Sequence, residues 1–391
     1  MLNLEQIAKC YGIQLINQEY VTVPDWDLVL SLSQDFRDLS TKETTSRWHQ
    51  EKNMLEHTKM VCEKMREYAN SDPYLYGDLR LILMLSAMFH DLGKCRCQNS
   101  EDGRLLSNGH PLISEKLCRL HLWDLEVVDR ERICEIVRWH DLYCSSDISD
   151  RKLKTKIGQL SMWLFVHTDM LFKMFLSDDH GSLKPAELEG GAQKMVHRIE
   201  SLLKTEKFHT VPNSKGKGIS KEFEIYVMCG LPGSGKSTWC SENLKGMPVI
   251  SRDNIREELG MTENGVKFMG TPEQEDLVSK ISDERVLEYC KAGQSFVYDN
   301  MNSRERYRRS FYEKVKKFKP IMRYVYLEVT DLSVLEARRP EISSKGPAVY
   351  KTMIEKMEFP RPDEYDTIEV FQNLSVPEET FRDSLMGVLH L

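Results

Sequence analysis

A glycine-rich segment at residues 230–237, GLPGSGKS, constrains the fold of this 391-residue chain more than any other feature. It fits the pattern GxxxxGK[ST], follows the strand-like run FEIYVMC at 223–229 and precedes a helix-like segment. In that context the glycines let backbone N–H groups turn onto phosphate oxygens, the lysine reaches the outer phosphates of a nucleotide, and the hydroxyl meets Mg²⁺. The sequence therefore predicts a site for ATP and Mg²⁺, with Ser237 also as a magnesium ligand. The residues predicted to form it are Gly233, Ser234, Gly235, Lys236, Ser237 and Thr238.

The sequence changes character near residue 207, which predicts two domains with different folds. Residues 1–206 carry apolar patterns of helical length, such as LRLILMLSAMFHDLG and RERICEIVRWHDLY, with few β-branched runs. Short strand-like runs then alternate with helical segments, as is typical of a parallel α/β sheet. We therefore predict an all-α domain over residues 1–206, a linker at 207–222, and an α/β domain with a parallel sheet over 223–391.

The bulk composition narrows the class of protein and its compartment. A formal net charge of −7 does not favour a strongly basic nucleic-acid-binding protein, although a local basic groove is compatible with it. The ten cysteines include no CxxC pair, which favours reduced thiols. No apolar run reaches the ~18 residues that a spanning helix needs. The N-terminal segment MLNLEQIAKCYGIQL lacks the apolar core of a secretory signal, so we expect a cytoplasmic protein with no membrane partner.

The segment VISRDNIREELG at 249–260 is the second candidate for chemistry in the α/β half. A short strand leads into a helix, and Asp253 and Arg256 lie at the start of that helix. In one interpretation, Asp253 or Asn254 simply caps the helix N-terminus. In the other, Asp253 is a general base and Arg256 holds a phosphate, as phosphoryl transfer requires. The spacing alone does not decide between them.

Taken together, GLPGSGKSTW and SRDNIR resemble the 5′-hydroxyl polynucleotide kinase family. The resemblance implies that Asp253 activates the 5′-OH of the acceptor and that Arg256 holds a phosphate of the acceptor strand. FVYDNMNSRERYRRSF, at 296–311, resembles the third strand of that family and implies that Asp299 lies near the metal or the acceptor.

A further segment, LEARRPEISSKGPAVYKTMIEKM, resembles the basic lid that closes over ATP in the same family. The resemblance makes Arg338 and Arg339 the candidate lid residues with a catalytic role. Where related kinases have a further lid arginine, this chain has SSKG with Lys345, and lysine cannot make the bidentate phosphate contact of arginine. The resemblance covers about residues 223–370.

The helical half contains a spaced series of imidazole and carboxylate side chains within apolar patterns. The run LILMLSAMF ends abruptly in His90 and Asp91, and burying such groups without partners costs roughly 2–7 kcal/mol each. A divalent transition metal such as Mn²⁺, Co²⁺, Ni²⁺ or Zn²⁺ would compensate for this cost. The predicted ligands are His57, His90, Asp91, His110, His140 and Asp169.

The order of this series resembles the HD phosphohydrolase superfamily, an all-helical fold of metal-dependent phosphoesterases. His57, His90, Asp91 and Asp169 match the residues that ligate its metal. His110 and His140 match a pair that some members use for a second metal or for phosphate, and Lys94 matches a lysine near the scissile phosphate. His49 is a candidate to line the site. The remaining candidates are interpreted as structural or surface residues: His121, His167, Asp178 and His180.

The two halves together resemble the bacterial bifunctional HD-domain polynucleotide kinases, which heal RNA ends. This resemblance implies RNA or DNA ends with a 5′-OH as one substrate, and RNA ends with a 2′,3′-cyclic, 2′- or 3′-phosphate as the other. An RNA ligase is then the expected partner.

Two alternatives remain open from the sequence. One is an HD nucleotidase fused to a kinase for a nucleoside or other small molecule, and the other is an HD sensor domain that regulates a kinase. The acidic net charge disfavours a nucleic-acid substrate, whereas the RYRR cluster at 306–309 favours it.

Overall fold

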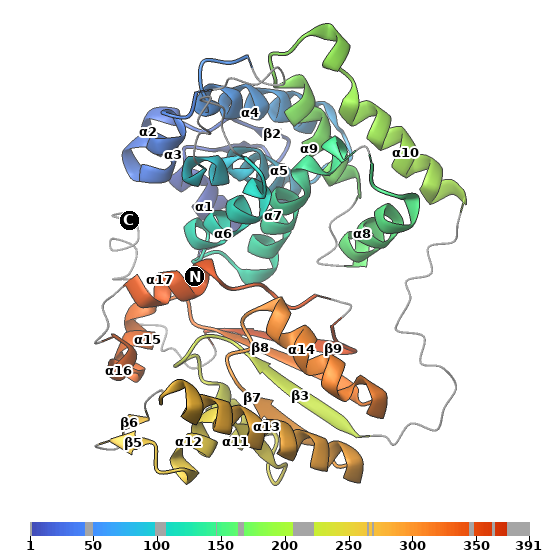
Figure 1. The fold of residues 1–391 in the computed structure, drawn as a ribbon. Coiled ribbons are helices and arrows are strands. Elements are labelled where there is room, and N and C mark those ends of the chain that lie inside the picture. Colours follow the sequence, from blue (N-terminus) through green and yellow to red (C-terminus); the bar gives the residue numbers. More distant parts are fainter. Residues whose placement is uncertain are drawn as a thin grey trace. The chain divides into compact units, whose positions relative to one another are not determined.

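The computed structural model describes residues 2–43, 50–97, 107–145, 147–162, 168–205, 223–263, 266–267, 270–343, 348–361 and 364–373 (Figure 1). The described residues up to Thr205 form one compact unit, and those from Phe223 onward form a second. The predicted linker at 207–222 lies outside the described residues, as do His49, His167 and Lys345. Within the described ranges, no helix combines the length and the apolar character needed to cross a bilayer.

The first unit is helical, apart from a two-stranded hairpin of β1 (Leu15–Ile16) and β2 (Tyr20–Val21). Its early helices are α1 (Leu4–Cys10), α2 (Trp26–Leu32), α3 (Gln34–Leu39), α4 (Met54–Ser71) and α5 (Gly77–Phe89). After the 3₁₀ turn η1 (Leu92–Arg96) come α6 (His110–His121) and α7 (Val127–Trp139). The unit then continues with η2 (His140–Cys144), α8 (Asp150–Met162), α9 (Thr168–His180), η3 (Ala186–Leu188) and α10 (Gly191–Thr205).

Helix α5 forms the centre of this unit. Its residues from Arg80 to Phe89 are all buried, as expected of a helix that is apolar on every side. Helices α1, α4, α7 and α9 pack around it. Because α5 ends at Phe89, the buried core leads directly into His90 and Asp91, which are 0% and 1% exposed.

The second unit is built on a five-stranded, fully parallel sheet. The strand order is β4 (Val249–Ser251), β7 (Phe296–Asp299), β3 (Glu224–Cys229), β8 (Ile321–Glu328) and β9 (Thr367–Gln372). The helices are α11 (Lys236–Asn243), α12 (Arg252–Glu258), α13 (Pro272–Ala292), α14 (Glu305–Val315), α15 (Leu332–Arg338), α16 (Pro340–Ser343) and α17 (Ala348–Glu355). A hairpin of β5 (Thr262–Glu263) and β6 (Val266–Lys267) and the turn η4 (Lys316–Phe318) complete it. Figure 1 shows α13 and α14 on one face of the sheet.

The strand register brings three segments to one edge of this sheet. Asp299 at the end of β7 is aligned with Met228 of β3 and with Ser251 of β4. The carboxyl ends of these three strands therefore open side by side, which is where ligands bind in open parallel sheets. The predicted fold class, a helical N-terminal region followed by an α/β P-loop domain with a parallel sheet, is confirmed.

Candidate functional sites

The loop between β3 and α11 has the backbone geometry of a phosphate cradle. Gly230, Gly233 and Gly235 have φ values of 146°, 83° and 94°, a region that residues with a Cβ rarely adopt. A Cβ at Gly230 would lie 2.2 Å from the carbonyl oxygen of Leu327. The glycines are therefore required for this turn, which delivers the chain to the N-terminus of α11, where backbone N–H groups favour anions.

The first two residues of α11, Lys236 and Ser237, contribute polar side chains next to this loop. Lys236 Nζ donates hydrogen bonds to the carbonyl oxygens of Gly230 (3.0 Å) and Leu231 (2.9 Å), and burial lowers the pKa of its ammonium. Ser237 Oγ donates to Asp299 Oδ2 at 2.8 Å. A hydroxyl next to a carboxylate at the end of the neighbouring strand is an oxygen pair suited to Mg²⁺.

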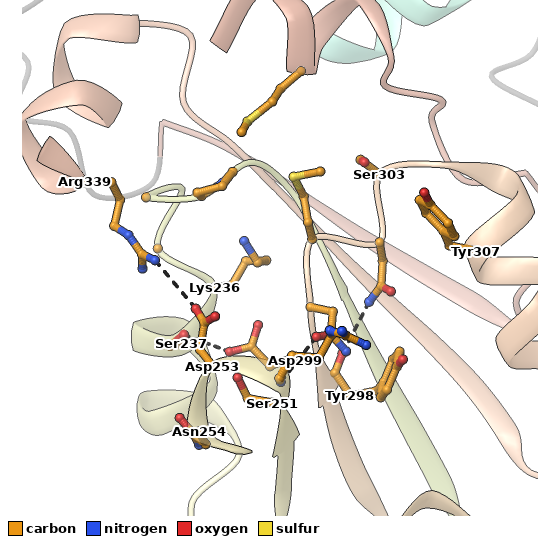
Figure 2. Close-up of a pocket in the computed structure, with 18 of the residues that line it drawn as sticks. Lys236, Ser237, Ser251, Asp253, Asn254, Tyr298, Asp299, Ser303, Tyr307 and Arg339 are labelled. Carbon is orange, nitrogen blue, oxygen red and sulfur yellow. Dashed lines mark hydrogen bonds and ion pairs between the residues drawn. The ribbon is translucent and has the colours of Figure 1, made fainter. Parts of the chain in front are cut away.

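A pocket of about 1350 Å³ opens above this edge of the sheet (Figure 2). Its walls come from the glycine-rich loop, the start of α12, the end of β7, α14, and the two arginines at the end of α15. The sequence-predicted residues that line it are Gly233, Gly235, Lys236, Ser237, Thr238, Asp253, Arg256, Asp299, Arg338 and Arg339. Ser234, which was also predicted, is buried in the loop.

Asp253 projects into this pocket and does not cap its helix. The N-cap of α12 is Ser251, whose side chain makes no capping hydrogen bond, and the backbone N–H of Arg252 donates instead to Asn300 Oδ1 at 3.4 Å. The Asp253 side chain is 41% exposed, accepts a 2.7 Å hydrogen bond from Arg256 on Oδ1, and has Arg339 Nη2 3.6 Å from Oδ2. The capping interpretation is therefore wrong for both Asp253 and Asn254.

Arg256 is fixed by a residue that the sequence analysis did not identify. Glu275 of α13 accepts hydrogen bonds from Arg256 Nε (2.9 Å) and Nη2 (2.8 Å), and one from Arg252 Nη2 (2.7 Å). Hydrogen bonding to Arg256 lowers the pKa of this carboxyl, burial opposes that effect, and Arg252 lowers the pKa further. The resulting pKa of Glu275 is about 2. Glu275 is 19 residues from Arg256 and belongs to no motif, so only the packing of α12 on α13 reveals the contact.

Arg338 and Arg339 lie beside the glycine-rich loop. Arg338 Nη1 donates a 3.0 Å hydrogen bond to the Gly233 carbonyl oxygen, and both guanidinium groups line the pocket. Figure 2 shows Arg339 directed toward Asp253 from the side of α15. These placements give the pocket cations on the side where the loop would hold nucleotide phosphates.

In the first unit, four imidazoles and two carboxylates meet at the end of α5. Two groups have donor atoms within 4.8 Å of one another, and every member of both groups is buried. The groups are His57, His90 and Asp178, and Asp91, His110 and His140. Five of the six predicted ligands are therefore together.

Asp91, a member of the second group, also contacts the first. Its Oδ2 is 3.3 Å from His57 Nε2 and 3.4 Å from His90 Nε2. Its Oδ1 is 2.9 Å from His110 Nε2 and 3.4 Å from His140 Nε2. One carboxylate thus faces both groups, an arrangement that can bridge two cations.

Hydrogen bonds at Nδ1 determine which ring nitrogen of each histidine faces the cluster. Nδ1 of His90, His110 and His140 lies 2.7 to 2.8 Å from a backbone carbonyl oxygen, which requires a proton on Nδ1. The Nε2 lone pairs then point at the carboxylates. Among the described residues, Oδ1 of Asp91 and Oδ1 of Asp178 are buried without a hydrogen-bond donor. Converging lone pairs of nitrogen and oxygen fit a divalent transition metal.

The electrostatics of the centre favour charged carboxylates. Burial alone would raise the pKa of Asp91, but Lys94 and the neighbouring rings outweigh it and hold this pKa well below its usual range. Lys94 Nζ is 2.7 Å from Asp91 Oδ2, and the lysine is only 5% exposed. Burial likewise opposes charge on His57, yet Asp178, Asp91 and Glu51 raise its pKa well above the usual value.

Asp169 is the exception among the predicted ligands, and its prediction as a ligand is wrong because it lies outside the cluster. Its side chain is 60% exposed and pairs with Lys173 at 2.5 Å. Asp178, interpreted from the sequence as structural or surface, lies in the cluster instead, with Oδ1 3.1 Å from His57 Nε2. The two aspartates are nine residues apart on α9, about two and a half helical turns, so they point to opposite sides of the helix.

The partly buried Tyr143 and the buried Glu51 support the cluster from outside. Tyr143 donates a 3.2 Å hydrogen bond to Asp178 Oδ2, and Glu51 Oε1 lies 3.5 Å from His57 Nδ1. The other described histidines are elsewhere, since His121 contacts Asp35 at 3.0 Å and His180 contacts the Tyr68 hydroxyl.

A comparison with known protein families finds a match within the second unit. The AAA domain family matches residues 225–356. Among solved structures, a candidate kinase from Chloroflexus aurantiacus is 14% identical over 44% of this chain and 94% of that chain, with a TM-score of 0.32. An unliganded sugar kinase from a Janibacter species is 19% identical over 42% of this chain and 93% of that chain, with a TM-score of 0.29. No curated protein matches the chain. The part of the chain from β3 to α17 is thus a P-loop α/β domain similar to the AAA domain family.

Proposed function

We propose that the protein is a bifunctional enzyme that processes nucleic-acid ends. The second unit transfers the γ-phosphate of ATP to the 5′-OH of a polynucleotide. The first unit removes a 2′,3′-cyclic, 2′- or 3′-phosphate from RNA ends with the help of a divalent transition metal. The observation that carries the proposal is that Asp253 shares one pocket with Lys236 and Ser237, while a separate unit gathers six metal-ligand side chains.

In the phosphotransfer step, each pocket residue has a defined task. Ser237 and Asp299 would hold Mg²⁺ beside the nucleotide, and Lys236, Arg338 and Arg339 would neutralise the phosphate oxygens of the nucleotide. Asp253 accepts the proton of the 5′-OH. The oxygen of that hydroxyl bonds to the γ-phosphorus of ATP as ADP leaves. Arg256, held by Glu275, positions Asp253 and a phosphate of the acceptor strand.

For the hydrolytic step, the histidine and aspartate cluster would hold the metal. The bound metal supplies Lewis-acid activation of the phosphate ester and of water. The backbone carbonyls that bond to Nδ1 keep the Nε2 lone pairs of His90, His110 and His140 directed inward. Lys94, beside Asp91, is placed to neutralise charge that develops on the phosphoryl oxygens.

A single assay tests both parts of the proposal. An RNA with a 5′-OH end and a 2′,3′-cyclic phosphate end is incubated with the protein, ATP, Mg²⁺ and Mn²⁺, and both ends are mapped. Lys236→Ala should lower 5′ phosphorylation by about 100-fold or more, because a phosphate-binding cation is lost. Asp91→Ala should abolish removal of the terminal phosphate.

Each variant should retain the other activity, because the two sites lie in separate compact units. Loss of both activities in a well-folded single variant would contradict the two-site proposal. Faster phosphorylation of free nucleosides than of the RNA would overturn the polynucleotide acceptor and favour a small-molecule kinase.

A further inference from the structure

The pocket of the second unit has an exposed aromatic ring that the steps above do not use. Tyr307, on the first turn of α14, is 51% exposed and lines the pocket. Figure 2 shows Tyr307 on the side of the pocket opposite Arg339, with Asp253 and Asp299 between them. The ring therefore lies across the pocket from Arg339, on the side that the proposed function leaves for the acceptor.

Two guanidinium groups lie over this ring. Arg306 Cζ lies 4.6 Å from the ring centroid, and its Nη2 donates a 2.7 Å hydrogen bond to the Tyr307 hydroxyl. Arg304 Cζ lies 5.8 Å from the same centroid. An aromatic face with adjacent cations is the combination that binds a base and its phosphate in single-stranded nucleic acids.

Basic side chains continue from this ring beyond the pocket. Residues 304–319 contain eight Lys or Arg and two Glu, within a chain whose net charge is −7. Arg308 is not part of the surface, because it is buried and bonded to Glu364. Lys314 lines the pocket two turns after Tyr307.

The wall that carries the ring is anchored to the sheet. Phe311 of α14 stacks on Tyr298 of β7, with ring centroids 4.1 Å apart and an interplanar angle of 14°. The buried pair of Arg308 and Glu364 holds the same helix. A rigid wall lowers the ordering cost of binding, which favours Tyr307 as a fixed contact surface.

We infer that Tyr307 stacks on a base of the acceptor strand and that Arg304 and Arg306 bind the adjoining phosphate. This inference rests on the proposed kinase activity and deepens it. It identifies the acceptor as a single strand of at least two nucleotides that runs along α14, and not as a nucleoside or mononucleotide.

The test compares 5′-OH acceptors of different length. Initial rates are measured for a nucleoside 3′-monophosphate, a dinucleotide and a ten-nucleotide oligomer with wild type, Tyr307→Ala, Tyr307→Phe and Arg306→Gln. We expect Tyr307→Ala to lower the ratio of kcat/KM for the oligomer to that for the mononucleotide by roughly ten- to a hundredfold. Tyr307→Phe should retain most of that ratio because it keeps the stacking face.

Arg306→Gln should raise the KM for the oligomer and reduce the dependence of that KM on salt, since one phosphate contact is lost. Lys245→Gln is the matched control, because Lys245 is exposed in the same unit and does not line the pocket. An unchanged length preference in Tyr307→Ala would overturn the inference.

A binding measurement separates this result from failure of the proposed function. Fluorescence anisotropy of a labelled oligomer is recorded with the same variants. If wild type phosphorylates no 5′-OH acceptor, the kinase proposal fails, and anisotropy alone decides the role of Tyr307. Weaker binding by Tyr307→Ala than by Lys245→Gln supports the contact, and equal binding refutes it.

Discussion

At the residue scale, the contacts of Asp253 leave its carboxylate open to the pocket. Arg256 occupies one oxygen at 2.7 Å and Arg339 approaches the other at 3.6 Å, while the side chain remains 41% exposed to the pocket. A carboxylate that caps a helix would instead point back at the backbone N–H groups. The orientation of Asp253 leaves it accessible to an acceptor hydroxyl.

Asp253→Asn tests this role with almost no change of shape. The amide oxygen still accepts a hydrogen bond from Arg256, but the side chain no longer takes a proton. We expect kcat for phosphoryl transfer to fall about 100- to 10,000-fold, with little change in the KM for ATP. Asp276→Asn, an exposed carboxylate on α13 that does not line the pocket, is the control. Near-normal turnover of Asp253→Asn would exclude the general base.

Glu275→Gln tests whether the positions of the arginines matter. The neutral amide cannot hold Arg252 and Arg256 as two ion pairs, so we expect a several-fold higher KM for the acceptor and a smaller effect on the KM for ATP. The pKa of Glu275 is lowered to about 2. The stabilisation that its charged carboxylate provides is therefore complete above the pKa of the unfolded state, about 4.3, and is lost as the pH falls through about 2. Loss of activity between pH 5 and 6 should therefore be the same in Glu275→Gln and in wild type.

At the element scale, the face that α9 turns inward decides which carboxylate joins the histidine cluster. Met170, Met174 and Asp178 are buried on this helix, whereas Asp169 faces outward to Lys173. The inward face follows from the packing of α9 on α4 and α5. A carboxylate at position 178 is thereby brought to His57.

A pair of substitutions on α9 distinguishes these two carboxylates. Asp178→Asn should lower the transition-metal content of the purified protein, or weaken its Kd by roughly ten- to a hundredfold, because a charged ligand is lost. Asp169→Asn should leave both unchanged. Bound metal is measured by atomic emission, and circular dichroism checks that both variants are folded. Loss of metal in Asp169→Asn alone would contradict the arrangement described here.

At the scale of the whole molecule, the two candidate sites offer ligands that suit different ions. The cluster in the first unit is rich in imidazole, which prefers ions such as Mn²⁺, Co²⁺, Ni²⁺ or Zn²⁺, whereas the pocket in the second unit offers oxygen ligands that suit Mg²⁺. The two activities should consequently depend on different metals.

Removal of metal tests this separation. In protein treated with chelator and supplied with Mg²⁺-ATP alone, the 5′ end of the RNA should be phosphorylated while the 2′,3′-cyclic phosphate remains. Added Mn²⁺ or Ni²⁺ should then restore its removal, and His90→Ala should abolish that response. Healing of both ends by stripped protein with Mg²⁺ alone would show that the histidines have been assigned wrongly.

The sequence by itself determined the features that depend on short stretches of chain. The glycines at 230, 233 and 235 specify the loop because residues with a Cβ rarely adopt their backbone angles. The alternation of strands and helices specifies the parallel sheet. His90 and Asp91 were recognisable because they end a buried apolar helix.

The tertiary structure alone decided which distant residues meet. Asp178 in place of Asp169, Glu275 behind Arg256, and Tyr307 at the pocket edge all depend on how helices pack. A helix carries side chains on every side, and its own sequence does not specify which neighbour each will touch. Arg308 illustrates the same limit, since it belongs to the basic run RYRR and yet is buried against Glu364, 56 residues further along the chain. Contacts of this kind are set by the whole fold, because burial of a charge is tolerated only where the fold supplies a partner.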